Sequence, residues 1–226
     1  MSYRLTVLIP VYNEESTIGE VIDQVDAVPL EKEIVVVDDG STDRTGAILR
    51  SKTVIKRIHD SRINMGKGTA VRIGLTYATG DVVVIQDADL ELDPNEYQAL
   101  LRPITEERTN VVFGSRFLRP SGHPVPTRSR VANWAITGFA NLLFGTRLSD
   151  ALTAYKVVRT PLIRSIRLES RGFSFDVELT ARLARSGQRI VEVPIRYNPR
   201  SVSEGKKVRW LHAIDMVWTL IRCRLR

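Results

Sequence analysis

The chain has 226 residues, 43% of them hydrophobic and 26% charged, which is the composition of an ordinary globular protein with a substantial core. Its single cysteine, Cys223, excludes an internal disulfide, and its three histidines show no zinc-ligand spacing with that cysteine. The net charge of +7 indicates an anionic partner, but aromatic residues make up only 7% and are not interleaved with basic ones, so no nucleic acid is expected.

Four short apolar runs in the first half of the chain predict strands, and helical patterns separate them. The predicted strands are residues 5–9, 34–37, 54–58 and 82–85. A helix is expected from Ser16, a second one capped by Asp43, and a third from Gly68 to Tyr77, ended by Gly80. Such alternation predicts an α/β fold, Rossmann-like, with a mainly parallel sheet covered by helices on both faces.

The second half of the chain continues with helices and strands but is interrupted by a loop. Asp93 and Pro94 have the pattern of an N-cap and a first turn, so a helix is expected from there to about Glu107. A strand over 111–113 precedes a loop rich in proline over 120–126. The remaining predicted elements are helices over 131–144 and 175–185 and a strand over 190–195, whose Pro194 indicates a sheet edge.

Acidic residues directly follow three of the predicted strands. Asp87-Ala88-Asp89 comes after the fourth strand, Asp38-Asp39 after the second, and Asn13-Glu14-Glu15 after the first. The carboxyl ends of strands in an open α/β sheet are where ligands bind. Carboxylates gathered there need a counter-charge, and a hard divalent cation carrying a diphosphate supplies one. The pattern therefore predicts a nucleotide-sugar site.

The glycine-rich segment Gly66-Lys67-Gly68 fits neither of the common nucleotide-binding motifs. A phosphate-binding loop needs glycine where Ser61 stands, and it needs serine or threonine directly after the lysine. In the dinucleotide fingerprint, Val71 occupies the place of the third glycine. We therefore expect neither a nucleotide hydrolase with a phosphate-binding loop nor a nicotinamide-dependent dehydrogenase.

The sequence also gives an expectation for location. The first four residues lead directly into a strand without a secretory signal, and no run approaches the ~18 apolar residues needed to span a bilayer. We expect a cytoplasmic protein, with peripheral binding to the membrane surface as a further expectation. The basic residues are unevenly placed, since residues 110–148 contain five arginines and no acid. A solvated basic face and a phosphorylated or membrane-bound partner both remain open.

Five segments occur in the order and spacing of one enzyme family. They are Pro10-Val11-Tyr12-Asn13-Glu14, Asp38-Asp39-Gly40-Ser41, Asn64-Met65-Gly66-Lys67-Gly68, Asp87-Ala88-Asp89 and Gly114-Ser115-Arg116. On these segments the chain resembles family 2 glycosyltransferases with the GT-A fold. Matches that include Ser149-Asp150, Tyr155-Lys156 and Phe175-Asp176 extend the resemblance to the dolichyl- or polyprenyl-phosphate mannose and glucose synthases.

The resemblance implies a single GT-A domain over 1–226 and a role for each matching position. The domain would comprise a nucleotide-sugar half over 1–115, an acceptor half over 116–208 and a basic amphipathic helix over 209–226. The residues expected to bind the UDP- or GDP-hexose donor are Pro10, Tyr12, Glu14, Val37, Asp39, Lys67, Asp87, Ala88 and Asp89. Asp89, together with Glu91, is expected to hold Mg²⁺ or Mn²⁺. The residues expected at the acceptor phosphate are Arg116, Arg128, Arg130, Arg200 and Lys206.

The chemistry of a polyprenyl phosphate acceptor sets what the enzyme must supply. Its nucleophile is already an anion near pH 7, so no strong general base is needed. Arginines such as Arg116 would bring two anions together, and a metal on Asp89 would stabilise the departing nucleoside diphosphate. One direct displacement inverts the anomeric carbon. Asp150 is the candidate base if the acceptor is instead a sugar hydroxyl.

Two alternatives stay open on the sequence alone. The chain could act on a saccharide hydroxyl or a small phosphorylated acceptor, or it could be a non-catalytic module that binds nucleotide sugars or membranes. The C-terminal segment is also open to two interpretations. Trp210, Ile214, Val217 and Ile221 keep helical spacing, which fits a helix packed on the domain, or one lying on an anionic membrane with Trp218 and Leu225 inserted.

Overall fold

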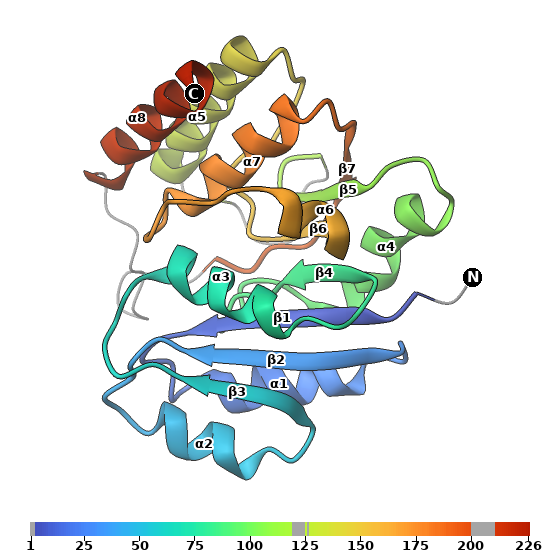
Figure 1. The fold of residues 1–226 in the computed structure, drawn as a ribbon, viewed down its shortest axis with the longest axis vertical. Helices are drawn as coiled ribbons and strands as arrows, with labels where there is room; N and C mark the ends of the chain where they lie inside the picture. The colour runs from blue at the N-terminus through green and yellow to red at the C-terminus, as the bar shows by residue number, and fades with distance from the viewer. Residues whose placement is uncertain (1–2, 119–124, 126, 200–210) are drawn as a thin grey trace.

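The computed structural model describes residues 3–118, 125, 127–199 and 211–226. Within these residues, one seven-stranded sheet is covered by helices on both faces (Figure 1). The strands are β1 (Leu5–Val11), β2 (Lys32–Asp38), β3 (Ile55–Asp60), β4 (Val82–Ile85), β5 (Val111–Ser115), β6 (Lys156–Arg159) and β7 (Ile190–Pro194). Their order is β3-β2-β1-β4-β6-β5-β7, and only β6 runs antiparallel to its neighbours. The predicted α/β class and mainly parallel sheet are confirmed.

Helices divide between the two faces of this sheet. They are α1 (Ile18–Ala27), α2 (Thr45–Ser51), α3 (Lys67–Tyr77), the 3-10 turn η1 (Pro94–Glu96), α4 (Tyr97–Thr105), α5 (Thr127–Phe144), α6 (Thr160–Ser165), α7 (Phe175–Arg185) and α8 (Leu211–Leu225). Side chains alternate along each strand, so Val7 and Ile9 of β1 pack with α1 and α4, while Leu8 packs with α3. The sheet is therefore buried on both sides, which explains why its strands are continuous apolar runs.

The ends of several predicted elements differ from the structure. The first strand was expected to end at Pro10, but β1 continues to Val11. Its pairing with β4 stops at Leu8, so at Pro10 only β2 lies alongside, and the missing N–H is tolerated. Asp93 caps the next helix as predicted, since its Oδ1 accepts the backbone N–H of Asn95 at 2.9 Å. That helix is broken, however, into a 3-10 turn and α4, which ends at Thr105.

Two elements were not predicted at all. Strand β6 enters the sheet between β4 and β5, and α6 follows it directly. Only two apolar residues form the middle of β6, and a fully buried Lys156 begins it. The predicted loop over 120–126 lies outside the described residues except for Val125.

The C-terminal helix packs on the fold through a face that coincides only partly with the predicted one, since Val217 and Ile221 are half-buried. Met216, Leu220 and Cys223 of α8 are buried, and α8 packs against α5 and α7. Ile214, which the spacing placed on the packed face, is exposed instead, and Trp210 lies outside the described residues. Among the helices that the structure describes, none has the length and apolar character needed to cross a membrane.

Candidate active site

The structure brings the three acidic segments together at one edge of the sheet. Strands β2, β1 and β4 are parallel neighbours, so their carboxyl ends meet there. Asp38 is the last residue of β2 and Asp39 follows it, while Asn13-Glu14-Glu15 and Asp87-Ala88-Asp89 begin two residues after the ends of β1 and β4. This edge is where an open α/β sheet binds its ligands.

Two of the three non-glycine residues with positive φ in the described part of the chain lie at the same edge, and the third is Glu107 after α4. Asn13 has a φ of 49° and Leu90 a φ of 59°, a region that residues other than glycine seldom occupy. Hydrogen bonds hold Asn13 in place, because its backbone N–H donates to Ser41 Oγ at 2.9 Å and its Oδ1 accepts the N–H of Thr42 at 2.8 Å. Such conformations persist where the surroundings impose them, and they cluster at functional sites.

Asp39 fixes the loop that leads into α3. Its two carboxylate oxygens accept the backbone N–H groups of Met65 at 2.9 Å and of Gly66 at 2.7 Å. Gly66 has a φ of 93°, a conformation that favours glycine. The buried Asp39 thus positions the start of α3 as well as lying at the edge where the nucleotide is expected.

A protein carbonyl occupies the N-terminus of α3. The N–H groups of Gly68 and Thr69 donate to the carbonyl oxygen of Arg171 at 2.6 and 3.2 Å. A Cβ on Gly68 would clash with the carbonyl oxygen of Ser170, so the glycine permits this close approach. The segment over 66–68 is therefore a packing motif, which agrees with its failure to match a phosphate-binding loop.

Lys67 lies in a chain of alternating charges. Its Nζ is 2.8 Å from Asp87 Oδ1 and 3.3 Å from Asp176 Oδ2, and Lys156 Nζ is 3.4 Å from Asp176 Oδ1. Burial alone would lower the pKa of Lys67, but the carboxylates of Asp176 and Asp87 raise it above its ordinary value. Lys156 also donates to the carbonyl oxygen of Thr153, and burial lowers its pKa. Lys67 therefore remains charged and orients Asp87.

The residues predicted to hold the metal are close in sequence and are oriented by their neighbours. Asp89 Oδ1 accepts the backbone N–H of Glu91 at 3.2 Å, and Glu91 Oε2 accepts the hydroxyl of Tyr197 at 3.0 Å. Ala88 is tied to α1, since its carbonyl oxygen accepts Thr17 Oγ1–H at 2.7 Å. In the part of the chain that is described, no group of three or more acidic, histidine or cysteine side chains could hold a metal by itself. One or two carboxylates suit Mg²⁺ or Mn²⁺ where a diphosphate supplies further oxygens.

Arg116 is held by Asp150 in a buried bidentate pair. Arg116 Nε donates to Asp150 Oδ2 at 2.7 Å and Nη2 donates to Oδ1 at 2.8 Å. Asp150 is fully buried, and Arg116 lies 5.1 Å above the ring of Tyr197. Burial alone would lower the pKa of Arg116, but Asp150, Tyr197 and Glu91 raise it. Tyr197 thus connects the arginine with the acidic segment after β4.

Glu192 of β7 fixes the backbone that carries Asp150. Its carboxylate accepts the backbone N–H groups of Ser149 and Asp150 at 2.8 and 3.0 Å and the hydroxyl of Ser149 at 3.0 Å. Burial raises the pKa of Glu192 in spite of these hydrogen bonds. The turn that presents Asp150 to Arg116 is therefore fixed by a neighbouring strand.

The other predicted site residues take several positions. Glu14 is buried just after β1, where its Oε2 lies 3.1 Å from Thr17 Oγ1, and Tyr12 beside it is half-buried. Pro10 and Val37 are buried and face each other in the register of β1 and β2. Two of the predicted arginines, Arg128 and Arg130, are exposed on the first turn of α5. Arg200 and Lys206 lie outside the described residues.

The sequence did not assign functional positions to Tyr197, Glu192, Asp176 and Lys156. Lys156 and Asp176 stand in segments that match the family pattern, but those matches carried no role. A buried lysine and a buried glutamate within strands are the signal that could have marked Lys156 and Glu192, since such groups need partners. Tyr197 contacts Glu91 across 106 positions, which no local pattern reveals.

Comparisons with known proteins agree with this geometry. A family model described as glycosyl transferase family 2 matches residues 6–169. An undecaprenyl-phosphate mannosyltransferase of Micrococcus luteus is 33% identical over 219 residues, covering 90% of this chain and 87% of that protein. A polyprenol monophosphomannose synthase of Mycolicibacterium smegmatis is 29% identical, covering 90% and 80%.

A solved structure supports the fold. Glucosyl-3-phosphoglycerate synthase from Mycobacterium tuberculosis, in complex with Mn²⁺, UDP and phosphoglyceric acid, superposes with a TM-score of 0.76 at 24% identity. The match covers 98% of this chain and 78% of that one. At this identity the likeness concerns the architecture of the chain.

Proposed function

The chain belongs to glycosyl transferase family 2, and we propose that it moves a hexose from a nucleotide-diphosphate sugar to a polyprenyl phosphate. It is thus a glycosyltransferase. We choose a phosphate acceptor because of the buried Arg116–Asp150 ion pair. This pair holds the guanidinium of Arg116 in a fixed position next to Tyr197 and the acidic segment after β4. A planar guanidinium binds phosphate oxygens with defined geometry. The relatives named for undecaprenyl-phosphate and polyprenol substrates support the same class of acceptor.

The two halves of the chain would bind different substrates, the donor and the acceptor. We assign the UDP- or GDP-hexose to residues 1–115, where Tyr12, Glu14 and Asp39 gather at the ends of β1 and β2. The acceptor falls to 116–208, with Arg116 as its central contact. Arg116 Nε and Nη2 donate to Asp150, so the guanidinium's further N–H groups are those that would bind the acceptor phosphate.

A divalent cation fits the donor side. Asp89, with Glu91, would hold Mg²⁺ or Mn²⁺ on the donor diphosphate, and the ion would supply Lewis-acid stabilisation of the leaving group. Hard oxygen ligands of this kind suit both ions. The structures of the M. tuberculosis synthase with Mn²⁺ or Mg²⁺ and UDP are consistent with this assignment.

The transfer itself is one displacement at the anomeric carbon, and it needs no general base from the protein. An oxygen of the acceptor phosphate attacks the anomeric carbon, the bond from that carbon to the nucleoside diphosphate breaks, and the electron pair leaves with the diphosphate oxygen. Attack from the opposite side inverts the anomeric centre. Because the nucleophile is already anionic, no side chain has to remove a proton. Asp150, whose two oxygens accept from Arg116, then acts as a positioning residue in place of the base that a hydroxyl acceptor would need.

The test is transfer of labelled hexose into an organic phase. The purified protein is incubated with labelled UDP-glucose or GDP-mannose, a polyprenyl phosphate in detergent, and Mg²⁺ or Mn²⁺. We expect label in the organic phase with one donor, and loss of that label in Asp89→Asn. Asp26→Asn, an exposed aspartate on α1, is the matched control and should retain transfer. Label that appears only in water-soluble products, formed from a sugar or a small phosphorylated acceptor, would overturn the proposal.

A further inference from the structure

Tyr197 lies between the donor side and the acceptor side of the candidate site, and the sequence had assigned it no role. It stands three residues after the end of β7, and only 6% of it is exposed. Its hydroxyl donates to Glu91 Oε2 at 3.0 Å, and Arg116 Cζ lies 5.1 Å from the centre of its ring. One buried side chain therefore contacts the donor side through its hydroxyl and the acceptor side through its ring.

Backbone hydrogen bonds fix the segment that carries Tyr197. The N–H of Ile195 donates to the carbonyl oxygen of Ser115, the last residue of β5, at 3.0 Å. The N–H of Asn198 donates to the carbonyl oxygen of Glu91 at 2.9 Å. Tyr197 stands between these two hydrogen bonds, so a displacement of its backbone would strain one of them.

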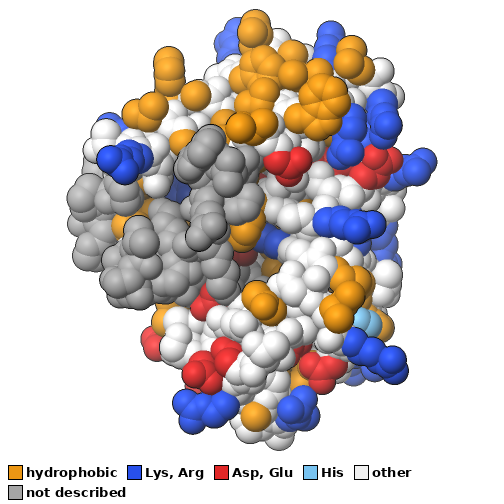
Figure 2. Space-filling view, turned by 90° about the vertical axis from the view of Figure 1, so that its left-hand side faces the viewer, with side chains coloured by type: hydrophobic (Ala, Val, Ile, Leu, Met, Phe, Trp, Pro, Cys, Tyr) orange, Lys and Arg blue, Asp and Glu red, His pale blue; other side chains and the backbone are white. Residues whose placement is uncertain are grey.

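Packing alone does not explain a tyrosine at this position. Tyr197 belongs to a buried hydrophobic cluster, whereas exposed hydrophobic side chains such as Trp218 and Leu225 belong to the end of the molecule where α5 and α8 lie (Figure 2). A buried hydroxyl needs a hydrogen-bond partner, and phenylalanine would fill the same space without that need. The hydroxyl is therefore explained by its partner, Glu91.

Two contacts define the orientation of the Arg116 guanidinium. Asp150 holds one edge of this planar group through two hydrogen bonds, and the ring of Tyr197 packs against it. The edge contact alone lets the group pivot about Asp150, so the ring helps to fix the direction of the N–H groups that do not bond to Asp150. A cation over an aromatic ring is attracted to it, most strongly where water is excluded. Phe117 presents a second ring at 5.7 Å, but its side chain has no hydroxyl that could reach Glu91.

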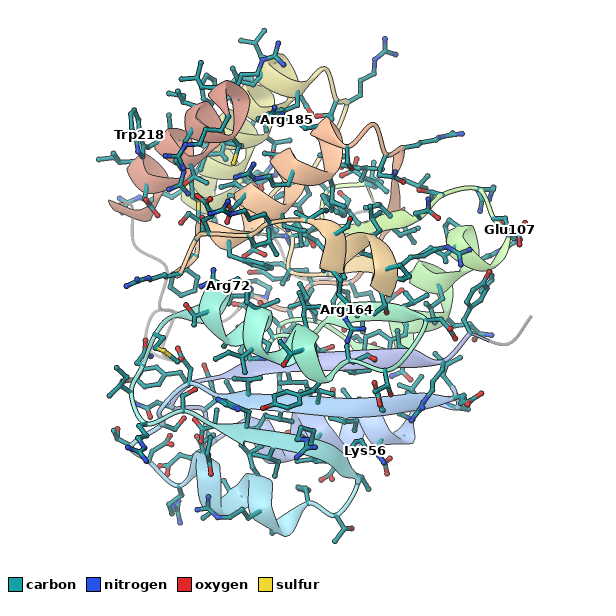
Figure 3. The ribbon with its side chains drawn as sticks, viewed as in Figure 1. Lys56, Arg72, Glu107, Arg164, Arg185 and Trp218 are labelled. Atoms are coloured by element: carbon teal, nitrogen blue, oxygen red, sulfur yellow. The ribbon has the colours of Figure 1, made fainter. Side chains whose placement is uncertain are left out.

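Arginines elsewhere in the fold are fixed without such a link. Arg164 of α6 donates to carbonyl oxygens at the C-terminal end of α3 (Figure 3). Arg159 lies over the ring of Tyr3, with its Cζ 4.8 Å from the ring centre, and its Nη2 donates to the hydroxyl of that tyrosine at 2.9 Å. The ring and the hydroxyl of Tyr3 thus contact the same arginine, whereas the hydroxyl of Tyr197 contacts a carboxylate of another segment.

We propose that Tyr197 is a positioning residue that holds the guanidinium of Arg116 at a fixed distance from the segment carrying Asp89 and Glu91. The acceptor phosphate on Arg116 and the donor diphosphate on that segment would then meet in a geometry suited to direct displacement. Correct placement of two reactants supplies a large part of the rate of an enzyme. This inference rests on the proposed function.

Two substitutions separate the contacts of Tyr197 by binding alone. Tyr197→Phe keeps the ring but removes the hydrogen bond to Glu91, and Tyr197→Leu removes both contacts. Calorimetric titration with Mn²⁺ in the presence of UDP or GDP should show about ten-fold weaker binding for Tyr197→Phe, as is usual when a group that orients a metal ligand is lost. Titration of the metal-free protein with a short-chain prenyl phosphate should show nearly unchanged affinity for Tyr197→Phe and about ten-fold weaker binding for Tyr197→Leu.

Tyr3→Phe and Tyr3→Leu are the matched controls, because Tyr3 also combines a ring contact and a hydrogen bond with an arginine. Neither control should change either affinity. Urea midpoints show whether each variant folds, and Tyr197→Phe retains the ring, so its result does not depend on the stability of Tyr197→Leu. Equal Mn²⁺ affinities in Tyr197→Phe and the unchanged protein would overturn the link to Glu91. Equal acceptor affinities in Tyr197→Leu and the unchanged protein would overturn the link to Arg116.

Turnover distinguishes failure of this inference from failure of the proposed function. With donor, Mn²⁺ and prenyl phosphate all saturating, kcat should fall about ten-fold or more in Tyr197→Phe, because alignment is lost rather than affinity. A merely structural role would lower the urea midpoint and leave kcat unchanged. Absence of transfer by the unchanged protein would contradict the proposed function. Normal transfer by the unchanged protein, with the same kcat in both Tyr197 variants, would overturn the positioning role alone.

Discussion

Lys67 Nζ lies 2.8 Å from Asp87 Oδ1, and this ion pair ties the start of α3 to the carboxyl end of β4. Asp176 on α7 completes the environment of the lysine at 3.3 Å. One ammonium group thereby joins α7 to two consecutive elements, α3 and β4, that are distant from it in the sequence. The first carboxylate of Asp87-Ala88-Asp89 is therefore neutralised within the protein by Lys67.

Replacing Lys67 with methionine should destabilise the fold. Lys67→Met keeps most of the apolar volume of the side chain but removes the cation that Asp87 and Asp176 share, which leaves Asp176 with Lys156 alone and costs about 3 kcal/mol. Lys52→Met is the control, because Lys52 pairs with the exposed Asp23, and such pairs contribute less than about 1 kcal/mol. Urea unfolding at neutral pH measures the loss of stability in each of the two variants. Equal shifts of the two midpoints would show that the buried charges do not depend on Lys67.

The second prediction concerns the geometry of Arg116. Arg116→Lys retains the positive charge but cannot make the bidentate contact with Asp150, so the cation loses its fixed position. We expect kcat to fall by about 100-fold, on the order of the loss seen when one catalytic donor is removed, with donor affinity nearly unchanged. Steady-state kinetics and calorimetric titration with the donor check this. Arg108→Lys, an exposed arginine, should change neither quantity, and a normal kcat for Arg116→Lys would remove Arg116 from the acceptor site.

Much of the fold could be predicted because the apolar pattern is local. Strand β4 is buried on both faces, and its four apolar residues were assigned without error. Strand β6 could not be predicted, since only Val157 and Val158 form its centre and its first residue is a lysine. β6 forms by antiparallel backbone pairing with both β4 and β5. Its partners are far from it in the sequence, so no local pattern predicts it.

The candidate site could also be predicted only in part from the sequence. Acidic residues directly after strands are visible in the sequence, and parallel neighbours necessarily bring them to one edge. Their partners are not visible, because Lys67 and Asp176 are separated by 109 positions. The buried face of α8 could not be chosen from the sequence for a related reason. That helix has apolar residues on several sides, and the positions of α5 and α7 decide that Met216 and Leu220 are buried.

A third prediction concerns pH and the end of the sheet opposite the site. Burial alone would raise the pKa of Glu33, but hydrogen bonds from Thr6 and Thr79 and the charge of Arg4 lower it below its ordinary value of 4.5. A carboxylate whose pKa is lower in the folded state stabilises the fold above the unfolded pKa, and this contribution is lost as the pH falls through the folded pKa.

Glu33→Gln removes that titration. The difference in the free energy of unfolding between the unchanged protein and Glu33→Gln should be largest near pH 6 and should decrease below about pH 4.5, as linkage requires. Chemical denaturation at a series of pH values measures the difference. Glu31→Gln, at an exposed position of the preceding turn, should give a small difference at every pH. A Glu33→Gln difference that stays constant with pH would show that Glu33 keeps an ordinary pKa in the fold.

The last prediction contrasts two helical glycines. A methyl group on Gly68 would clash with the carbonyl oxygen of Ser170 and lie 2.9 Å from Phe175 Cβ, so Gly68→Ala should destabilise the protein by about 1–3 kcal/mol. A methyl group on Gly138 of α5 would meet no atom within 4 Å, so Gly138→Ala should stabilise the protein by about 0.5–1 kcal/mol through the higher helix propensity of alanine. Urea midpoints should therefore move in opposite directions. Because Gly68 adjoins Lys67, its substitution should also weaken donor binding, while Gly138→Ala should not. Shifts of the same sign would mean that the segment over 170–171 can withdraw from α3, and that close packing there does not hold Lys67 against Asp87.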